Sequence, residues 1–554
     1  MTPFSLPRLA RSLDALRPHY DAVIVGSGYG GGVAACRLAR AGRSVAVLER
    51  GREVTTGEFP DRFPDMRREF RVTGGLISTG PETALFDVRL GTDMHVLVGC
   101  GLGGGSLVNA GVALRPDPRV LADPVWPGQV RQDGLIEEGY RRAARWLRPA
   151  ADPQAASMTK YKALLAASVA VGQPPIAPEV AVSFEATVNP AGIAQPACTR
   201  CGDCCAGCNV GAKNTVALTY LPEAARHGAE LFTHARVAHV EKQGDGRWRI
   251  VLRRLDTPRA GEAELVVSAD IVVLAAGTLG STEILLRSRA RGLAVSDRVG
   301  ERFSANGDII AFGYGAGTNV NAIGVGHPPK ADVGPIGAAV TGQIEIRSAD
   351  DLSLELTIQE GVLPSALAPV LPVLFIPKGR LLGALQSLVA GVYKGPFAGL
   401  QTYFAVSHDS SSGRLLLDGG ELRLAWPGAQ DEPVFKRLDA ALGKLVAELG
   451  GAYIKNPLAG NVMGHQPATA HPLGGASMGQ DRAQGVVDHT GRVFSADAHA
   501  GSSAGSNAVH RGLYVIDGSI IPRSLGVNPL LTITALAERA MLQMGTELGF
   551  GVGD

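Results

Sequence analysis

The sequence lacks a charge excess, a long apolar run and a secretory leader. Its 554 residues carry a formal net charge of +1, and the dispersed basic residues offer no footprint for nucleic acid. No charge-free and proline-free apolar run of about 18 residues is present. Prolines interrupt the most apolar stretch, Val362 to Leu400. The stretch up to Asp21 lacks the apolar core and cleavage site of a signal peptide. We expect a soluble, cytoplasmic protein that makes at most a weak, peripheral contact with a membrane surface.

Cysteine is scarce outside one short stretch. Five of the seven cysteines lie in CTRCGDCCAGC, residues 198–208. A disulfide framework fits poorly, because such scaffolds are short and secreted whereas this chain is long enough to build an ample core. The spacing C-x2-C-x2-C-x3-C is that of the bacterial ferredoxin run, although Asn209 stands where that run has proline and the partner motif is absent. The candidate ligands are Cys198, Cys201, Cys204 and Cys208, with Cys205 spare or an alternative.

Three interpretations of this cysteine-rich loop, residues 198–215, stay open. Thiolates at these spacings suit an iron–sulfur cluster, either 3Fe-4S or 4Fe-4S. They also suit a structural zinc ion, and the third interpretation is a loop without metal. An iron–sulfur cluster would provide a one-electron path to a quinone, cytochrome or ferredoxin, which the other two interpretations do not provide.

A dinucleotide-binding unit opens the chain. Residues 21–51 read DAVIVGSGYGGGVAACRLARAGRSVAVLERG, in which Gly26, Gly28 and Gly31 satisfy G-x-G-x-x-G between a β-branched run and a helical stretch. A second strand ends in Glu49, where a carboxylate can bind a ribose diol. A lone glycine motif is weak, but strand, helix and acidic residue together predict that the helix N-terminus binds a pyrophosphate.

Further nucleotide-domain elements are scattered along the chain. GCGLGGGSLVNAG, residues 99–111, adds a second glycine cluster that would let backbone approach a flat or anionic group. A strand–turn–helix follows at 271–288, and GLYVIDGSIIPRSLGVNPLLTITALAERA lies at 512–540. This order predicts one α/β domain interrupted by large insertions.

Together these motifs resemble the glucose–methanol–choline (GMC) oxidoreductases, and most closely their cholesterol oxidase branch. The resemblance covers nearly the whole chain and rests on VGSGYGGGVAACRLA, GLGGGSLVNAG, HPLGG at 471–475 and LYVIDGSIIPRSLGVNPLLTITALAER. It implies non-covalently bound FAD. The residues at the family's FAD-contact positions are Gly26, Gly28, Tyr29, Gly30, Gly31, Glu49, Gly104, Gly105, Asn109, Val237, Asp517, Gly518 and Asn528.

The resemblance also implies a catalytic pair, His471 and Asn528. Oxidising an alcohol requires that the hydroxyl proton be taken while a hydride leaves, and an imidazole suits that task. An amide can orient the alcohol without titrating. Cholesterol oxidases carry a glutamate in an A-G-L-E-T stretch that moves the steroid double bond. This sequence reads AGLQT with Gln401, so isomerisation by this residue is expected to be lost, unless His408 or Asp409 substitutes.

The resemblance predicts an α/β fold, in which a Rossmann-like FAD-binding domain of GMC type is interleaved with an α+β substrate domain. Residues 18–115, 226–303 and 484–550 are assigned to the first, and residues 116–225 and 304–483 to the second. Alternating segments such as LSLELTIQE predict an antiparallel sheet in the substrate domain. The apolar stretch 362–400 is expected either to cover a hydrophobic substrate or to form ordinary core helices.

The function expected on these grounds is FAD-dependent oxidation of a secondary alcohol on a hydrophobic, sterol-like skeleton. Reduced flavin would pass its electrons to oxygen or to a one-electron acceptor. One alternative is a polyol or sugar dehydrogenase of the same family, which the apolar stretch disfavours. Another is a non-catalytic flavin or cluster redox sensor, which the presence of both His471 and Asn528 disfavours.

Overall fold

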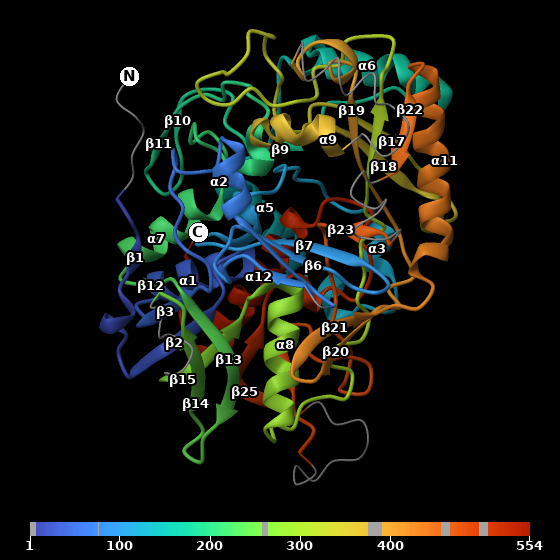
Figure 1. Ribbon diagram of the computed structural model, residues 1–554. Helices are drawn as coiled ribbons and strands as arrows, with labels where there is room; N and C mark the ends of the chain where they lie inside the picture. The colour runs from blue at the N-terminus through green and yellow to red at the C-terminus, as the bar shows by residue number, and fades with distance from the viewer. Residues whose placement is uncertain are drawn as a thin grey trace.

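The computed structural model describes residues 7–75, 77–256, 264–374, 391–455, 466–497 and 508–553. Within this part of the chain, a nine-stranded mixed sheet occupies the lower half of Figure 1 and a five-stranded antiparallel sheet the upper right. The predicted α/β fold with a second, antiparallel sheet is confirmed. The predicted domain boundaries stay a prediction, and the segments 375–390 and 456–465 fall outside the described residues.

The nine-stranded sheet is assembled from distant parts of the sequence. Strand β2 pairs in parallel with β3 and β15, and β15 also pairs in parallel with β25. The strands β2 and β3 are buried apolar runs, as expected for a parallel sheet covered on both faces. The strands are β1 (Ala10–Arg11), β12 (Glu230–Phe232), β3 (Val45–Leu48), β2 (His19–Val25), β15 (Glu264–Leu274), β14 (Trp248–Arg254), β13 (Ala235–Lys242), β25 (Val509–Val515) and β24 (Arg492–Phe494).

Two five-stranded sheets stand beside it. One is antiparallel, in the order β17 (Gln343–Ile346), β18 (Leu356–Gly361), β19 (Gln401–Ser407), β16 (Ile309–Tyr314) and β22 (Ala452–Lys455). The other is mixed, in the order β23 (Ala468–Thr469), β7 (His95–Gly99), β6 (Phe86–Arg89), β4 (Phe70–Gly74) and β5 (Ile77–Thr79). Two-stranded pairs are β8 (Ala150–Ala151) with β9 (Glu179–Val180), β10 (Thr187–Val188) with β11 (Ala194–Gln195), and β20 (Arg414–Asp418) with β21 (Glu421–Ala425).

Helices cover these sheets, and two of them begin at the predicted cofactor site. Helix α1 follows Gly28 and helix α12 follows Pro529. The helices are α1 (Tyr29–Arg40), α2 (Phe63–Arg68), α3 (Pro118–Ala122), α4 (Gln129–Gln132), α5 (Leu135–Leu147), α6 (Thr159–Ala167), α7 (Tyr220–Arg226), α8 (Gly277–Ala290), α9 (Leu371–Leu374), α11 (Pro433–Glu448) and α12 (Leu530–Leu548). Of the helices in the described ranges, none is both long and apolar enough to span a bilayer.

A buried ion pair joins α1, α7 and α12. Arg37 of α1 contacts Glu538 of α12 at 2.7 Å, and both side chains are fully buried. Tyr220 of α7 donates to the same carboxylate at 2.9 Å. Because removing one partner of a buried pair leaves an uncompensated charge, this network fixes the three helices against one another.

Candidate active site

A cavity of about 1220 Å³ lies between the nine-stranded sheet, the mixed sheet and the segment 362–371. Its volume exceeds the ~300–1,000 Å³ typical of a pocket for one small molecule. It therefore has room for a dinucleotide and a substrate together. All the predicted cofactor residues except Gly31 line it, and so do His471 and Asn528.

The two glycine-rich segments meet at this cavity. Gly104 has φ +56°, and a Cβ built on it would lie 2.7 Å from the Cα of Gly28. Gly31 lies behind the turn, where a Cβ would come within 2.0 Å of the Gly26 carbonyl oxygen. A side chain at Gly104 would push the two segments apart, and one at Gly31 would clash with the turn. The backbone of both segments and the first turn of α1 therefore line the cavity directly. This is the form of a pyrophosphate cradle at a helix N-terminus.

Polar side chains are held in place around the cradle. Glu49 accepts hydrogen bonds from the Ser27 hydroxyl at 2.6 Å and from the Gly51 N–H at 2.8 Å, which fixes its carboxylate at the end of β3. Asn109 donates to the Tyr29 hydroxyl at 2.7 Å. Fixed donors and acceptors of this kind can orient a ribose and a flat ring without rearranging when the cofactor binds.

Both carboxylate oxygens of Asp517 accept hydrogen bonds from other parts of the protein. It accepts from the Gly277 N–H at 2.9 Å and from the Ser519 N–H at 2.8 Å. Asp517 thereby ties the start of α8 to the turn that holds Gly518, and desolvation by burial raises its pKa. We interpret it as a residue that shapes the cavity wall, and Val237 of β13 lines the same cavity.

His471 and Asn528 lie side by side on the cavity wall. The Nδ2 atom of Asn528 lies 3.5 Å from Nε2 of His471. The imidazole is 19% exposed, and that exposed part lines the cavity. Asn528 directly precedes Pro529, the N-cap of α12. Its contact with His471 brings the end of the 512–528 segment and the HPLGG loop together.

Sequence reasoning missed two buried polar residues next to this pair. Asp308, just before β16, lies 3.1 Å from Nδ1 of His471. Gln359 of β18 donates to Oδ1 of Asn528 at 2.6 Å. Neither lies in a recognisable motif. The only signal was a charged or amide side chain in an otherwise apolar strand region, NGDII and LELTIQE.

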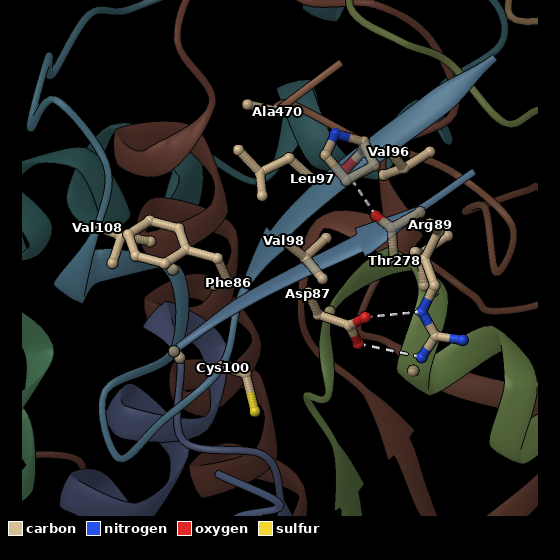
Figure 2. A pocket seen from close by; sticks show the side chains of 18 of the residues that line it. Phe86, Asp87, Arg89, Val96, Leu97, Val98, Cys100, Val108, Thr278 and Ala470 are labelled. Carbon is tan, nitrogen blue, oxygen red and sulfur yellow. Dashed lines mark hydrogen bonds and ion pairs between the residues drawn. The ribbon is translucent and has the colours of Figure 1, made fainter. Parts of the chain in front are cut away.

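The wall between β6, β7 and the segment 362–371 is apolar. Figure 2 shows Phe86, Leu97, Val98 and Val108 along one side, with the Asp87–Arg89 ion pair beyond them. Thr278 of α8 donates to the carbonyl of Pro472 at 2.7 Å, which anchors the loop next to His471. Val362, Leu363, Pro364, Leu367 and Leu371 also line the cavity. The described part of the 362–400 stretch therefore gives the cavity apolar surface.

Gln401 does not belong to the described lining of the cavity. It is fully buried on β19, and the described cavity lining includes Phe404 but not Gln401. Side chains three residues apart on a strand point to opposite faces, so Gln401 points away from the face of Phe404. His408 and Asp409 are also absent from the described lining. The expected loss of isomerisation by Gln401 stays a prediction, and neither His408 nor Asp409 lies in the described lining to take its place.

The cysteine-rich loop forms a second, much smaller enclosure. Its four predicted ligands line a cavity of about 20 Å³ together with Lys213. Burial raises the pKa of the Cys198 thiol to about 12 when no metal ion is bound. Within the described ranges, no group of three or more His, Cys, Asp or Glu side chains is placed to hold a metal ion. The observed arrangement of these side chains therefore does not fit the iron–sulfur cluster or the zinc ion that the cysteine spacing suggests.

Lys213 links this loop to the cofactor cradle. Its ammonium is buried and donates to the carbonyl oxygens of Leu107 at 3.2 Å, Asn109 at 2.5 Å and Cys204 at 3.2 Å. Gly207 has its α-carbon against Phe59, where a Cβ would lie 2.0 Å from the ring. The loop is packed tightly behind the second glycine segment and supports it.

The fold and the site define an oxidoreductase that works with a bound dinucleotide. The sequence profile of the GMC oxidoreductases matches residues 20–306. The chain belongs to this family. GMC oxidoreductases bind FAD and act on alcohols, and the glycine cradle described above fits FAD. When bound, FAD supplies the acceptor for the hydride that leaves the alcohol carbon.

Individual relatives agree with this assignment. A cholesterol oxidase of Mycobacterium tuberculosis is 27% identical over 580 residues, covering 95% of this chain and 91% of the relative. A cholesterol oxidase of Acinetobacter baumannii is 26% identical, covering 94% of each. Among solved structures, a pyridoxine 4-oxidase superposes with a TM-score of 0.59 at 19% identity, covering 95% of this chain and 99% of that one. A fungal aryl-alcohol oxidase gives the same TM-score at 16% identity, covering 96% and 100%. These structures share the fold.

Proposed function

We propose that this enzyme oxidises a secondary alcohol on a hydrophobic, sterol-like skeleton to the ketone. The observation that carries the proposal is the position of the His471–Asn528 pair, 3.5 Å apart, on the wall of a cavity whose adjoining surface is apolar. An imidazole nitrogen there can take the hydroxyl proton, while the amide N–H binds the alcohol oxygen. The cholesterol oxidases among the relatives support the substrate class.

The apolar wall favours this substrate over a polyol or sugar. A sugar site needs hydrogen-bond partners for several hydroxyl groups, and unpaired buried polar groups cost about 1–3 kcal/mol each. The residues of 362–371 that face the cavity are Val, Leu, Pro, Leu and Leu, which supply none. We assign the substrate's apolar rings to this wall and its hydroxyl to His471.

The test is an anaerobic comparison of three alcohols: a 3β-hydroxysterol, a long-chain primary alcohol and an aldohexose. We expect the sterol to reduce the flavin fastest, and the ketone product to keep its double bond in place because Gln401 lies outside the cavity lining. Faster reduction by the hexose would overturn the substrate class. Faster reduction by the primary alcohol would keep the apolar site but replace the secondary alcohol.

Oxygen is the electron acceptor that we propose, on the strength of the oxidases among the relatives. Hydrogen peroxide formed in stoichiometric amounts with the ketone would support it. Turnover only with a quinone or another artificial acceptor would make the enzyme a dehydrogenase. No step of the proposed reaction uses the cysteine-rich loop.

A further inference from the structure

Asp308 contacts the segment 469–471, which leads into the HPLGG loop, at three points. One carboxylate oxygen, Oδ2, accepts from the N–H of Ala470 at 2.7 Å and from the hydroxyl of Thr469 at 3.3 Å. The same oxygen lies 3.1 Å from Nδ1 of His471. That distance suits a charge-assisted hydrogen bond, although the ring is not aligned well enough for Nδ1 to count as bonded. Asp308 is 2% exposed, so little solvent competes for this contact.

A chain of amides fixes the other side of the pair. The Nε2 atom of Gln359 donates to Oε1 of Gln343 at 2.7 Å and to Oδ1 of Asn528 at 2.6 Å. Both of its hydrogens are therefore used. Asn528 must accept through its oxygen, and its Nδ2 is turned toward Nε2 of His471.

The direction of this chain is set at its far end by a carboxylate. The Nε2 atom of Gln343 donates to Oε1 of Glu345 at 2.6 Å, and the same carboxylate pairs with Arg347 at 3.1 Å. A carboxylate oxygen paired with a guanidinium can only accept. Gln343 must consequently offer its oxygen to Gln359, and no member of the chain can turn over without breaking a buried hydrogen bond.

The two sides impose the same requirement on the imidazole. Asp308 selects the tautomer that carries its proton on Nδ1, and the N–H of Asn528 selects the tautomer with a lone pair on Nε2. We propose that Asp308 and Gln359 are positioning residues that lock His471 in this one tautomer, with the basic nitrogen toward the cavity. The inference rests on the proposed function for what that nitrogen does.

The chemistry of the locked pair is balanced as follows. The O–H bond of the alcohol breaks and its proton moves to Nε2 of His471. The C–H bond breaks with its electron pair, which leaves as hydride to the flavin, and the carbon–oxygen double bond of the ketone forms. The opposite tautomer carries a hydrogen on Nε2, so it cannot take the proton and would also face the Asn528 N–H, donor against donor.

The first test is the substitution D308N in the FAD-loaded enzyme. The Ala470 N–H and Nδ1 of His471 both meet the same Asp308 oxygen, so the amide of D308N cannot satisfy both as the carboxylate does. With its nitrogen in that place, the amide donates to Nδ1 and favours the wrong tautomer. With its oxygen there, the negative charge that selects the proton on Nδ1 is gone. We expect flavin reduction by the alcohol to slow by about 10²- to 10⁴-fold, the range for a general base. Histidine-specific ¹⁵N NMR without alcohol should show a proton on Nδ1 of His471 in the wild type, and a larger share of the tautomer with the proton on Nε2 in D308N. The spectrum of H471A assigns the signal among the twelve histidines.

Substitutions of Gln359 test the other side. Q359E would place an acceptor against Oδ1 of Asn528, so the amide should turn over and present its oxygen to His471, again favouring the wrong tautomer. Q359M removes both hydrogen bonds without imposing a direction, so we expect a smaller loss, about tenfold, and an unchanged tautomer. A merely structural role for Gln359 predicts that Q359M is at least as harmful as Q359E.

Asp409 supplies a matched control, because it accepts from Ser304 and Gly307 of the turn before Asp308 but is not in contact with His471. D409N should keep the wild-type tautomer. If H471A abolishes flavin reduction while D308N and Q359E keep the wild-type tautomer and rate, the inference is wrong and the proposed function stands. If H471A still oxidises alcohols, the proposed function fails instead. If D308N does not fold, the wild-type spectrum still tests the inference. A proton on Nε2 of His471 in the wild-type enzyme would overturn it.

Discussion

The His471–Asn528 pair and the cysteine-rich loop are both clusters of reactive side chains, but they face different amounts of space. The first opens on a cavity of about 1220 Å³. The second closes on one of about 20 Å³, packed against Phe59 and bridged by Lys213. The comparison teaches that reactive residue types indicate chemistry only where the fold leaves room for a reactant. We therefore assign catalysis to the first region and support of the cofactor cradle to the second.

The substitution H471A is the strongest test of the assignment of catalysis to the first region. We expect flavin reduction by the alcohol to fall by about 10²- to 10⁴-fold, because the proton acceptor is lost, while FAD stays bound. Stopped-flow absorbance measures the first and the flavin content of the purified protein the second. H227A, at a half-exposed histidine of the loop after α7, is the control. A loss below tenfold in H471A would remove this residue from the chemistry.

K213M tests the cysteine-rich loop as a support. It would leave three buried carbonyl oxygens without their donor, so we expect the free energy of unfolding to fall by about 2–4 kcal/mol. FAD should also be released more readily, because two of those carbonyls belong to the second glycine segment. Chemical denaturation and flavin release measure the two effects. K444M, at an exposed position of α11, should change neither. An unchanged free energy of unfolding in K213M would show that the hydrogen bonds of Lys213 do not stabilise the protein.

N528A sharpens the division of roles within the first region. The amide orients the alcohol but does not take its proton, so we expect about a tenfold slower reduction, smaller than in H471A. The free energy of unfolding should fall by about 1–3 kcal/mol, because Gln359 loses the acceptor for one of its buried N–H groups. An effect as large as that of H471A would mean that the two residues act as one unit.

C201S should have the smallest effect. With no metal-holding group in the described structure, we expect both half-reactions to stay within about threefold of the wild type. Anaerobic purification with iron and zinc analysis is the companion measurement. One equivalent or more of iron in the wild type, lost in C201S together with fast reoxidation, would restore the iron–sulfur cluster that the cysteine spacing predicts.

The sequence predicted those parts of the site that depend on local backbone. G-x-G-x-x-G encodes its own turn, and HPLGG and GVNPLLT each carry a recognisable residue order. The positioning residues could not be found in this way. Asp308 meets His471 across 163 residues of chain, and Gln359 meets Asn528 across 169, so only the folded topology brings them together.

Two other expectations depend on side-chain geometry that spacing along the chain cannot show. The AGLQT match placed Gln401 at a substrate position, but strand alternation turns its side chain away from the cavity face. The cysteine spacing did bring four thiols to one enclosure. Spacing along the chain does not specify how closely the sulfur atoms converge, and in this loop the packing of Lys213 and Phe59 decides that.

The pairing of β15 with both β2 and β25 has a consequence for how the protein is made. On the ribosome, β2 and β15 emerge long before β25, which begins only at Val509. Until β25 is synthesised, β15 has one open edge, and α1 lacks the Glu538 partner that its buried Arg37 needs. The nucleotide-binding half can therefore close only after the chain has been translated through α12, and the nascent chain must keep that edge from pairing with other chains in the meantime.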